Sequence, residues 1–345
     1  MAQLDPWLLA HLVCPRDHRP LRADGRALVC DQHHRYPVVD GVPVMLVGES
    51  PHTIDIAARS LETAAAATDG SPWFLDTLSL SDDERQGIVE LARKGGTIDP
   101  VVAYLVAATN GLMYKHLIGT LDRYPIPTLT LPAGAGRRLL DVGCSWGRWT
   151  LAASERGYEA VGLDPSLGAV MAARRVAAQM GRPARYLVGD ARHLPFAPGT
   201  FDAAYSYSVI QHFSRPDAGR AVAEMGRVLK PGGIARVQMP SKFGIRCLYH
   251  QVRRGFREPR GFEVRYWSLP QLRRLFGEQV GPVRFDVDCY FGIGLQSSDA
   301  HLMTPRLAAI LRLSESLKAA SRVVRPLVWA ADSVFVEASR RGAAA

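Results

Sequence analysis

From Arg138 onward, short apolar runs alternate with longer amphipathic segments, and this alternation limits the possible folds more than any other feature of the chain. The amphipathic segments predict three helices, at 147–156, 166–180 and 216–229. The apolar runs predict five strands, at 138–142, 159–163, 185–188, 202–207 and 234–238. Strands that alternate with helices in this way favour a parallel sheet covered on both faces.

Glycines mark the expected ends of two of these helices, because Gly157 and Gly181 follow them directly. Further along, 283–290 and 333–338 are predicted to add two strands at the far edge of the sheet, with helical sequence at 305–328 between them. The expected class is therefore α/β, with seven strands in the main sheet.

The first part of the chain has a different pattern. Residues 1–48 contain short apolar runs at 27–30, 36–39 and 42–47 with turn signals between them, which predicts a small β-rich module. Residues 49–134 are expected to form a linker and helical region: a loose connector over 50–80, then helices at roughly 82–94 and 99–121. The main domain is predicted to cover 135–345.

The chain of 345 residues holds 42 basic and 33 acidic side chains, and the excess is concentrated near one end. Residues 241–345 hold 17 basic and 9 acidic side chains, a net charge of +8 out of +9. Eight arginines lie between Arg246 and Arg274, interleaved with aromatic residues. Such a segment could bind an anionic substrate through guanidinium groups, could follow an RNA backbone, or could be an ordinary solvated surface.

Several classes of protein are disfavoured by the sequence. No run approaches the ~20 apolar residues of a membrane helix. The first residues lack a basic segment followed by an apolar one, so no secretory signal is visible. Five irregularly spaced cysteines do not form a disulfide framework. We therefore expect a cytoplasmic protein without a membrane span.

A glycine-bearing turn follows the first predicted strand of the main domain, in the sequence Asp141-Val-Gly143-Cys-Ser145-Trp-Gly147. Turns of this kind at the carboxyl end of a parallel strand bind nucleotides, because glycine lets the backbone approach a ligand closely. The spacing is not the G-x-G-x-x-G of dinucleotide-binding proteins, since the sixth position counted from Gly143 is Arg148.

Acidic residues end the next two strands. Asp164 follows the second strand, where a carboxylate can accept both hydroxyls of a ribose. Asp190 follows the third strand, where it could accept a hydrogen bond from an adenine amino group. Singly, each of these residues could equally cap the helix that follows it.

Taken in order, these segments resemble the class I S-adenosylmethionine-dependent methyltransferases, especially the ubiquinone/menaquinone-type subgroup. About 100 residues carry the resemblance, in the segments LLDVGCSWG (139–147), VGLDPS (161–166), VGDARHLPF (188–196), FDAAYSYSVIQHF (201–213) and RVLKPGG (227–233). The resemblance implies a Rossmann-like seven-stranded methyltransferase core that binds S-adenosyl-L-methionine.

The resemblance also assigns site residues. It implies that Asp164 holds the ribose, that Asp190 and Ala191 hold the adenine, and that Gln211 lies beside the reacting centre. The residues implied to shape the methionine-binding turn are Asp141, Gly143, Ser145 and Gly147, with Tyr114 implied to cover the methionine end. Ser145 departs from the family, which usually has glycine there.

The catalytic candidates are side chains that could accept a proton from the methyl acceptor. His212 is the first of these, because a histidine can titrate near neutral pH. A satisfied structural histidine is the alternative. Tyr207 and Tyr266 are the other two candidates.

The basic segment 241–276 is expected to form much of the acceptor site and its lid, and 292–330 a helical insertion. The residues expected to bind an anionic acceptor are Arg253, Arg254, Tyr249 and Trp267.

Two Cys- and His-containing segments lie in the first module, Cys14-Pro-Arg-Asp17-His18 and Cys30-Asp-Gln-His33-His34. With residues 36–46, they resemble the small zinc-ribbon activator of tRNA methyltransferases, although the second cysteine of each pair is missing. The predicted zinc ligands are Cys14, His18, Cys30 and His33, with Asp17 and His34 as alternatives to the two histidines.

The sequence therefore predicts a methyltransferase that acts on a small or carrier-bound, anionic acceptor in biosynthesis, by O- or N-methylation. An RNA methyltransferase is the alternative, because some rRNA methyltransferases also carry a zinc ribbon. A catalytically silent binding partner is disfavoured, since both acidic positions for the cofactor are intact.

Overall fold

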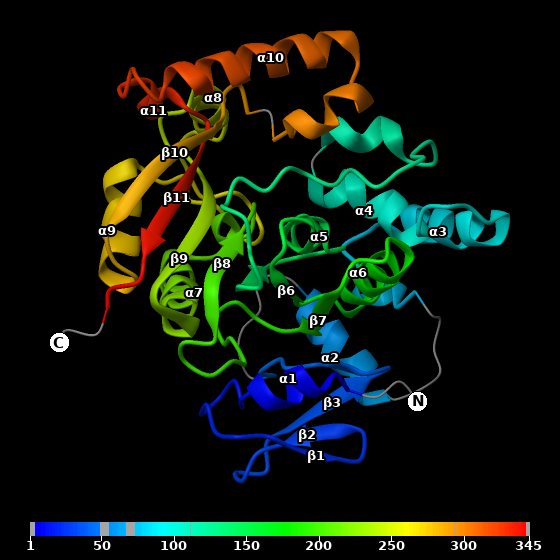
Figure 1. Ribbon diagram of the computed structural model, residues 1–345. Coiled ribbons are helices and arrows are strands. Elements are labelled where there is room, and N and C mark those ends of the chain that lie inside the picture. The colour runs from blue at the N-terminus through cyan, green and yellow to red at the C-terminus, as the bar shows by residue number, and fades with distance from the viewer. Residues whose placement is uncertain (1–3, 49–54, 67–72, 111, 293, 343–345) are drawn as a thin grey trace. The chain divides into compact units, whose positions relative to one another are not determined.

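The structure, a computed structural model, describes residues 4–48, 55–66, 73–110, 112–292 and 294–342 (Figure 1). The chain divides into two compact units, Met1–Thr200 and Phe201–Ala345. The first unit contains the N-terminal module, the helical linker and the first three strands of the main sheet. The second contains the remaining four strands.

The N-terminal module is a small antiparallel sheet preceded by a helix. Its elements are α1 (Pro6–His11), β1 (Arg22–Asp24), β2 (Ala27–Val29), β3 (Arg35–Val39) and β4 (Val42–Pro43). The β-rich character was predicted, whereas α1 and β1 were not. Helix α1 begins at Pro6 because the Asp5 carboxylate caps it, accepting the Trp7 N–H at 2.7 Å.

This module is bonded to the rest of the first unit through its backbone. Val44 forms a parallel bridge with Val188, the last residue of β7 (Ala184–Val188), and the Met45 N–H donates to the Val188 carbonyl at 2.8 Å. The Val13 N–H donates to the Pro195 carbonyl at 3.0 Å. Such bonds satisfy backbone groups at the edge of the sheet, so the module is an integral part of the first unit.

The linker region is more ordered than predicted. Its elements are α2 (Ile56–Ala66), η1 (Leu75–Thr77), α3 (Asp82–Lys94), α4 (Pro100–Asn110) and η2 (Leu112–Leu117). The predicted bounds of α3 are correct, and a capping box between Ser81 and Glu84 fixes its start.

The prediction of a loose connector over 50–80 is wrong for the described part of that range. The Ser60 hydroxyl donates to the Pro165 carbonyl at 2.8 Å, and the Thr77 hydroxyl accepts the Gly168 N–H at 2.7 Å. These hydrogen bonds anchor α2 and η1 to the start of α6 (Leu167–Gln179). The bonded residues are about 100 residues apart in the sequence, so no local sequence pattern predicts these bonds. The ordered structure of this segment was therefore not predicted.

The strands of the first unit lie close to their predicted positions. They are β5 (Arg138–Val142), β6 (Glu159–Asp164) and β7, and neighbouring strands pair in parallel. Helix α5 (Arg148–Glu155) follows β5 and helix α6 follows β6. The Ser166 hydroxyl caps α6. This arrangement brings the ends of β5 and β6 to one edge of the sheet.

The second unit begins with β8 (Phe201–Ser206), η3 (Ile210–His212), α7 (Arg215–Val228) and β9 (Leu229–Pro240). Strand β11 (Ser333–Ser339) lies antiparallel between β9 and β10 (Val283–Cys289). Strand β9 starts five residues earlier than predicted, because Leu229 already pairs with Phe201 of β8. The Lys230 ammonium donates to the Asp202 carboxylate at 2.8 Å near this start.

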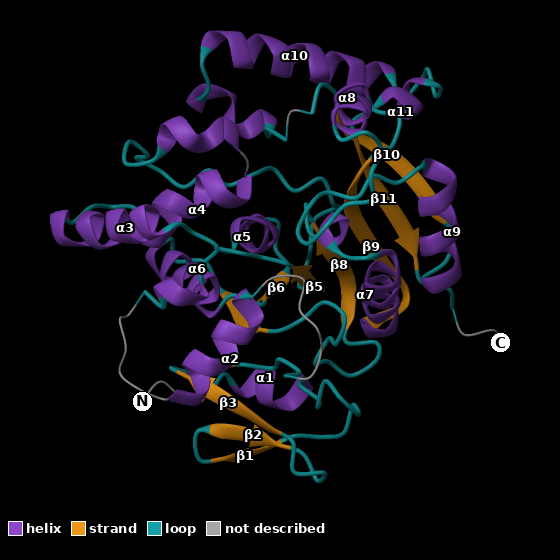
Figure 2. Cartoon of the chain, turned by 180° about the vertical axis from the view of Figure 1, so that it is seen from behind, coloured by secondary structure: helices purple, strands orange, loops and turns teal. Residues whose placement is uncertain are grey.

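Helices surround these strands (Figure 2). Helix α7 packs against α9 (Leu269–Gln279), and α10 (Pro305–Ala320) and α11 (Leu327–Ala330) pack on β10. The predicted helical sequence at 305–328 is therefore correct. Helix α8 (Ile245–Arg253) lies in the segment that was predicted to be a lid.

Together the strands form a seven-stranded mixed sheet in the order β10-β11-β9-β8-β5-β6-β7, beside the four-stranded sheet β1-β2-β3-β4. The predicted α/β class with a Rossmann-like seven-stranded core is confirmed. No helix in the described ranges is both long enough and apolar enough to cross a membrane.

Candidate cofactor and acceptor sites

The turn between β5 and α5 has the conformation that its glycines require. Gly143 and Gly147 have φ values of 80° and 84°. A Cβ at Gly147 would lie 2.7 Å from the Tyr186 hydroxyl, so a side chain there is excluded sterically as well. Ser145 also has positive φ, at 47°, where an L-residue is strained and glycine is not. A glycine at this position would adopt the positive φ without strain, which explains why the family usually has glycine there. Ser145 adopts the same φ with some backbone strain.

Asp164, at the end of β6, is bonded directly to this turn. Its Oδ2 accepts the Ser145 N–H at 2.9 Å, and its Oδ1 accepts the Ser166 N–H at 3.0 Å. Burial raises the pKa of Asp164 to about 6. Because each carboxylate oxygen has two lone pairs, both oxygens can still accept a hydroxyl hydrogen. The turn and the carboxylate predicted for the cofactor are therefore brought together.

Asp141 lies beneath the same turn and is 1% exposed. Its Oδ2 accepts the Thr150 hydroxyl at 2.7 Å. Its Oδ1 and the Ser145 hydroxyl are buried, and neither has a hydrogen-bond partner among the described residues. Burial raises the pKa of Asp141 to about 7. Buried polar atoms are normally satisfied, so this turn has spare hydrogen-bonding capacity that a bound ligand would fill.

Asp190 is occupied by a partner that was not predicted. Its carboxylate oxygens accept from the Arg192 guanidinium at 2.6 Å and 3.0 Å, and both side chains are buried. An adenine amino group would have to share the carboxylate with Arg192. Ala191, between them, is also buried.

Tyr114, predicted to cover the methionine end, is fully buried in η2. Its hydroxyl accepts a hydrogen bond from Arg148 at 3.4 Å, and the Arg148 guanidinium lies 5.4 Å from its ring centroid. The sequence analysis missed Arg148, which is 5% exposed. The available signal was a cation at the first position of a helix, where the helix dipole disfavours positive charge.

In the second unit, His212 is packed against the segment that follows α8. Its Nδ1 lies 2.7 Å from the Phe262 carbonyl, and its ring stacks on that of Phe262 with the centroids 3.8 Å apart. Its Nε2 lies 3.2 Å from the Gln211 amide nitrogen. The carbonyl requires the proton on Nδ1, so Nε2 is the acceptor in a neutral ring.

The pKa of His212 corrects the prediction that it titrates near neutral pH. Burial lowers the pKa of His212 to about 4. The hydrogen bond to the Phe262 carbonyl acts in the opposite direction and raises this pKa, but its effect is smaller. His212 is therefore neutral at pH 7 and is a weak base. Gln211, predicted to lie beside the reacting centre, donates from its amide to the Ser208 hydroxyl at 2.8 Å as well as to His212.

Tyr207, the second catalytic candidate, lies in a buried polar network. Its hydroxyl is 3.2 Å from Asp288 Oδ2 and accepts from the Gln296 amide at 2.9 Å. Burial raises the pKa of Asp288, so this carboxyl group holds a proton more tightly than an exposed one. The network was not visible in the sequence, because Asp288 and Gln296 follow Tyr207 by 81 and 89 residues.

Tyr266, the third candidate, is not suited to act as a base near neutral pH. Burial raises its pKa to about 12, and the Arg254 guanidinium lies 5.7 Å from its ring centroid. Arg254 also donates to the Val264 carbonyl at 3.2 Å. Arg254, predicted to bind the acceptor, thus joins α8 to the following segment.

Of the other residues predicted to bind the acceptor, Tyr249 and Arg253 lie on the surface and Trp267 is buried. Tyr249 is 55% exposed on α8, with the Arg253 guanidinium 5.8 Å from its ring centroid. Trp267 was predicted to bind the acceptor, but it is 4% exposed and covered by Arg215 at 4.4 Å. Trp267 is a core residue, and its role as an acceptor contact stays a prediction.

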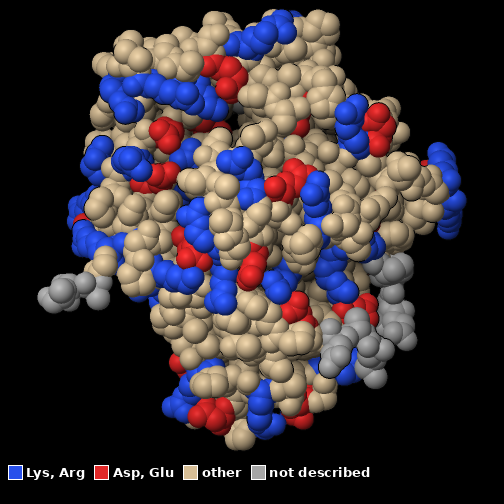
Figure 3. Space-filling model, viewed as in Figure 1, with Lys and Arg blue, Asp and Glu red and all other residues tan. Residues whose placement is uncertain are grey.

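The arginines of this segment are largely satisfied within the protein. Glu263 accepts two hydrogen bonds from Arg257, at 2.6 Å and 2.7 Å, and the Arg260 N–H at 2.9 Å. Arg265 donates to the His212 carbonyl at 2.8 Å. Lys and Arg side chains are interspersed with carboxylates over most of the face drawn in Figure 3. This pattern weakens the inference from arginine content to an anionic acceptor.

In the N-terminal module, four side chains form a compact group: Cys14, Asp17, Cys30 and His34. The His34 Nδ1 lies 3.4 Å from the Sγ atoms of Cys14 and Cys30 and 3.4 Å from Asp17 Oδ2. Zinc bonds of roughly 2.0–2.3 Å in a tetrahedron separate neighbouring ligand atoms by about 3.3–3.8 Å. The three distances to His34 lie in this range, whereas Cys30 Sγ and Asp17 Oδ2 are 4.0 Å apart and would have to approach each other around an ion.

The structure chooses between the histidines that the sequence left open. His18 and His33 are turn residues with φ values of 59° and 62°, and neither joins the group. Their predicted role as ligands is corrected in favour of Asp17 and His34. Sequence spacing alone does not reveal which residue of each pair faces the group.

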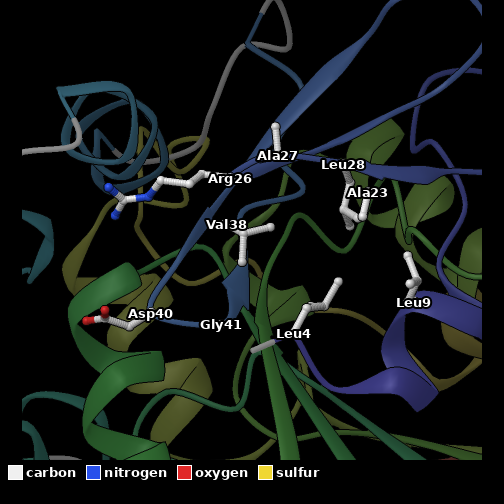
Figure 4. A pocket seen from close by; sticks show the side chains of 10 residues that line it. Leu4, Leu9, Ala23, Arg26, Ala27, Leu28, Val38, Asp40 and Gly41 are labelled. Carbon is white, nitrogen blue, oxygen red and sulfur yellow. The ribbon is translucent and has the colours of Figure 1, made fainter. Parts of the chain in front are cut away.

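A pocket of about 480 Å³ also lies in this module (Figure 4). Its apolar lining includes Leu4, Leu9, Leu28 and Val38, while the charged group of Arg26 points away from it in Figure 4. A binding site for a polar cofactor needs convergent polar groups, which this lining does not supply. The pocket is therefore not the cofactor site.

Comparisons with known proteins agree with the geometry of the turn. Residues 139–233 match the family described as "Methyltransferase domain". The matched range contains the turn between β5 and α5, and it lies where the sequence resembles the S-adenosylmethionine-dependent methyltransferases.

Two curated relatives and one solved structure illustrate the likeness. The chain is 32% identical over 164 residues to the biotin biosynthesis bifunctional protein BioHC of Cellvibrio japonicus, covering 48% of this chain and 29% of that protein. It is 39% identical over 101 residues to the demethylmenaquinone methyltransferase of Thermus thermophilus, covering 29% of this chain and 45% of that protein. The chain thus spans less than half the length of these relatives.

The solved structure is the complex between the Haloferax volcanii Trm112 methyltransferase activator and the putative methyltransferase. It has a TM-score of 0.43 and 18% identity, and it covers 71% of this chain and 95% of that chain. At this TM-score the likeness adds nothing to the assignment of a partner or a substrate.

Proposed function

We propose that the protein transfers a methyl group from S-adenosyl-L-methionine to a small or carrier-bound acceptor of a biosynthetic pathway. One observation carries the proposal: the Asp164 carboxylate at the end of β6 accepts the Ser145 N–H of the glycine-bearing turn at 2.9 Å. This places a ribose-binding carboxylate and a backbone cradle in one location, as a nucleoside-containing cofactor requires.

Each part of the cofactor has a suitable group in the first unit. Asp164 would accept the ribose hydroxyls, and Asp190 with Ala191 would border the adenine. The unpartnered Asp141 Oδ1 and Ser145 hydroxyl fit the ammonium of the methionine part. The buried Arg148 at the start of α5 would attract the methionine carboxylate. The bound cofactor supplies a methyl group already activated on a sulfonium, so the protein's task is to position the acceptor.

The acceptor is inferred from two of the catalytic candidates, His212 and Tyr266. His212, with a pKa of about 4, is a weak base at pH 7, and Tyr266, with a pKa of about 12, is still protonated there, so neither readily takes a proton from a neutral hydroxyl. An acceptor atom that is already unprotonated, such as a carboxylate oxygen, an ionised enol or a free amine, needs no such base. His212 Nε2 would then orient the acceptor by accepting a hydrogen bond.

The names of the relatives support a biosynthetic acceptor. One is a biotin biosynthesis protein, one is a demethylmenaquinone methyltransferase, and a 35% identical Serratia marcescens relative is a malonyl-[acyl-carrier protein] O-methyltransferase. A carrier-bound carboxylate, the acceptor named for the Serratia marcescens relative, satisfies the requirement for an unprotonated oxygen. We therefore rank O-methylation of such a carboxylate before N-methylation.

A turnover screen that measures S-adenosylhomocysteine release tests this proposal. The acceptor pools are acyl-carrier-bound carboxylates, quinols, phenols, sugar nucleotides and total RNA. Turnover with the first two supports the proposal. Turnover with RNA alone would contradict it and favour the RNA methyltransferase. The matched control is Asp164→Ala, which should lower turnover with every pool when S-adenosyl-L-methionine is limiting, because it removes the carboxylate proposed to bind the ribose.

A further inference from the structure

Helix α8 presents its apolar side to solvent. Ile245, Leu248, Tyr249 and Val252 are 55%, 41%, 55% and 56% exposed, and their spacing of three and four residues places them on one side of the helix. The opposite side carries Cys247 and Gln251, which are 7% and 6% exposed. This is the reverse of an ordinary surface helix, whose apolar side faces the core.

Hydrogen bonds between α8 and neighbouring segments fix the helix with its apolar side outward. Asp332 Oδ1 accepts the N–H groups of Arg246 and Cys247 at 2.7 Å and 2.8 Å. The Gln251 amide donates to the Lys242 carbonyl at 2.7 Å. The outward apolar face is therefore built into the fold rather than left over from a poorly packed helix.

The residues around α8 extend the apolar surface. Phe243 before the helix and Phe256 after it are 49% and 61% exposed. Asp332, which holds the start of α8, lies two residues after the end of α11. Trp329 on α11 is 48% exposed, and Val323, in the turn before α11, is 86% exposed. Exposed apolar side chains gathered on one side of a helix are typical of an interaction site.

Basic side chains predominate on α8 and beside it, and the nearest following carboxylates are Glu258 and Glu263, of which Glu263 pairs with Arg257. Residues 241–257 contain five basic side chains and no Asp or Glu, and 322–331 contain Arg322 and Arg325 and no acidic residue. Among the described residues, no ion pair joins Lys242, Arg246 or Arg253 to a carboxylate. Their charges remain available to an anionic surface.

We propose that α8 docks the protein on the surface of an anionic phospholipid bilayer. A convex helix with apolar and aromatic residues on its outward side and arginines along its flanks has the composition of an interfacial helix, which lies in the plane of the membrane. The apolar side chains enter the boundary between headgroups and acyl chains, and Arg246, Arg253 and Lys242 meet lipid phosphates. Complementary charge distinguishes this partner from a neutral bilayer.

Vesicle co-sedimentation of the full chain tests the proposal. The protein should sediment with vesicles of phosphatidylglycerol and phosphatidylcholine, and should remain unbound with phosphatidylcholine alone. Raising the salt from 0.1 M to 1 M shortens the screening length from about 10 Å to about 3 Å, so binding should weaken. Equal binding to both kinds of vesicle, or no binding to either, would overturn the proposal.

A matched pair of variants locates the contact. Val252→Glu should weaken partitioning into anionic vesicles by roughly tenfold or more, because it places a like charge and a polar group in the interface. Leu313→Glu is the control, since Leu313 is 53% exposed on α10 and outside the proposed contact. Equal loss in both variants would overturn the assignment to α8.

Two further measurements keep this proposal separate from the proposed function. S-adenosylhomocysteine should bind Val252→Glu and the wild-type chain with equal affinity, which shows that the variant is folded. If light scattering instead shows a dimer that Val252→Glu dissociates, a second copy covers α8 and the membrane proposal is overturned. Failure to bind vesicles leaves the methyltransferase proposal intact, because the latter depends on the first unit.

Discussion

The ring of His212 stacks on that of Phe262, and its Nδ1 lies 2.7 Å from the Phe262 carbonyl. One residue thus shields the imidazole from water and also fixes its tautomer. Two further hydrogen bonds fix the segment 254–265. Arg254 donates to the Val264 carbonyl within the segment, and Arg265 donates to the His212 carbonyl, so the segment is bonded to His212 through both Phe262 and Arg265.

The first prediction follows from this contact. Phe262→Ala should raise the pKa of His212 from about 4 toward its ordinary value of 6.5, because removal of the ring admits water. NMR titration of the imidazole should show a rise of at least about one unit. Leu313→Ala, a distant exposed site, is the control. An unchanged pKa would mean that burial by other residues controls His212.

The second prediction concerns the pH dependence of cofactor binding. The pKa of Asp164 is raised to about 6, so its carboxylate becomes protonated as the pH falls through 6 and loses acceptor capacity. Affinity for S-adenosylhomocysteine should therefore be constant above pH 7 and fall by up to about tenfold per unit below pH 6. Calorimetry at several pH values measures this.

Two variants of Asp164 complete the test. Asp164→Ala should weaken binding by about 1.5–3 kcal/mol at pH 8, the range for hydrogen bonds to charged groups. Asp164→Asn should bind weakly and without the fall below pH 6. The same pH dependence in Asp164→Asn would assign the titration to another group, of which Asp141 is the first to examine.

The third prediction concerns stability. The pKa of Asp141 is about 7 in the fold, against 3.8 ordinarily, so the folded chain binds a proton more tightly than the unfolded chain. The free energy of unfolding should then fall as the pH rises from about 4 to about 7. Asp141→Asn should flatten this dependence and raise stability at pH 8 by at least about 1 kcal/mol, while weakening cofactor binding. Urea unfolding at pH 5 and pH 8 measures both effects.

The cofactor half of the site was predictable because its signals are local. Gly143, Gly147 and Asp164 each follow a strand whose apolar run is visible in the sequence, and parallel strands bring their ends to one edge. The sequence already shows that Ser145 stands where the family usually has glycine. Only the structure shows that this residue has a φ of 47°.

The acceptor half was less predictable because its controlling contacts are distant in sequence. The Phe262 shield over His212 and the Asp288 carboxyl beside Tyr207 come from 50 and 81 residues away. Burial changes the pKa values and removes Trp267 from the surface, and a single sequence does not report burial. The predicted domain boundaries at 48 and 134 stay predictions.

The last prediction concerns the four-residue group of the N-terminal module. Protein purified without a histidine tag should contain stoichiometric zinc by elemental analysis, because Cys14, Asp17, Cys30 and His34 offer one sulfur pair, one nitrogen and one oxygen at near-tetrahedral spacing. Cys14→Ser and His34→Ala should each lose the metal.

His18→Ala and His33→Ala are the matched controls, because these turn residues neighbour the ligands yet lie outside the group. Both should retain zinc. Loss of zinc in the controls but retention in His34→Ala would restore the ligand set expected from the sequence. Metal-free wild-type protein, with a melting temperature that a chelator leaves unchanged, would show that hydrogen bonds such as that between Cys14 Sγ and the Tyr36 hydroxyl, at 3.2 Å, hold the module without an ion.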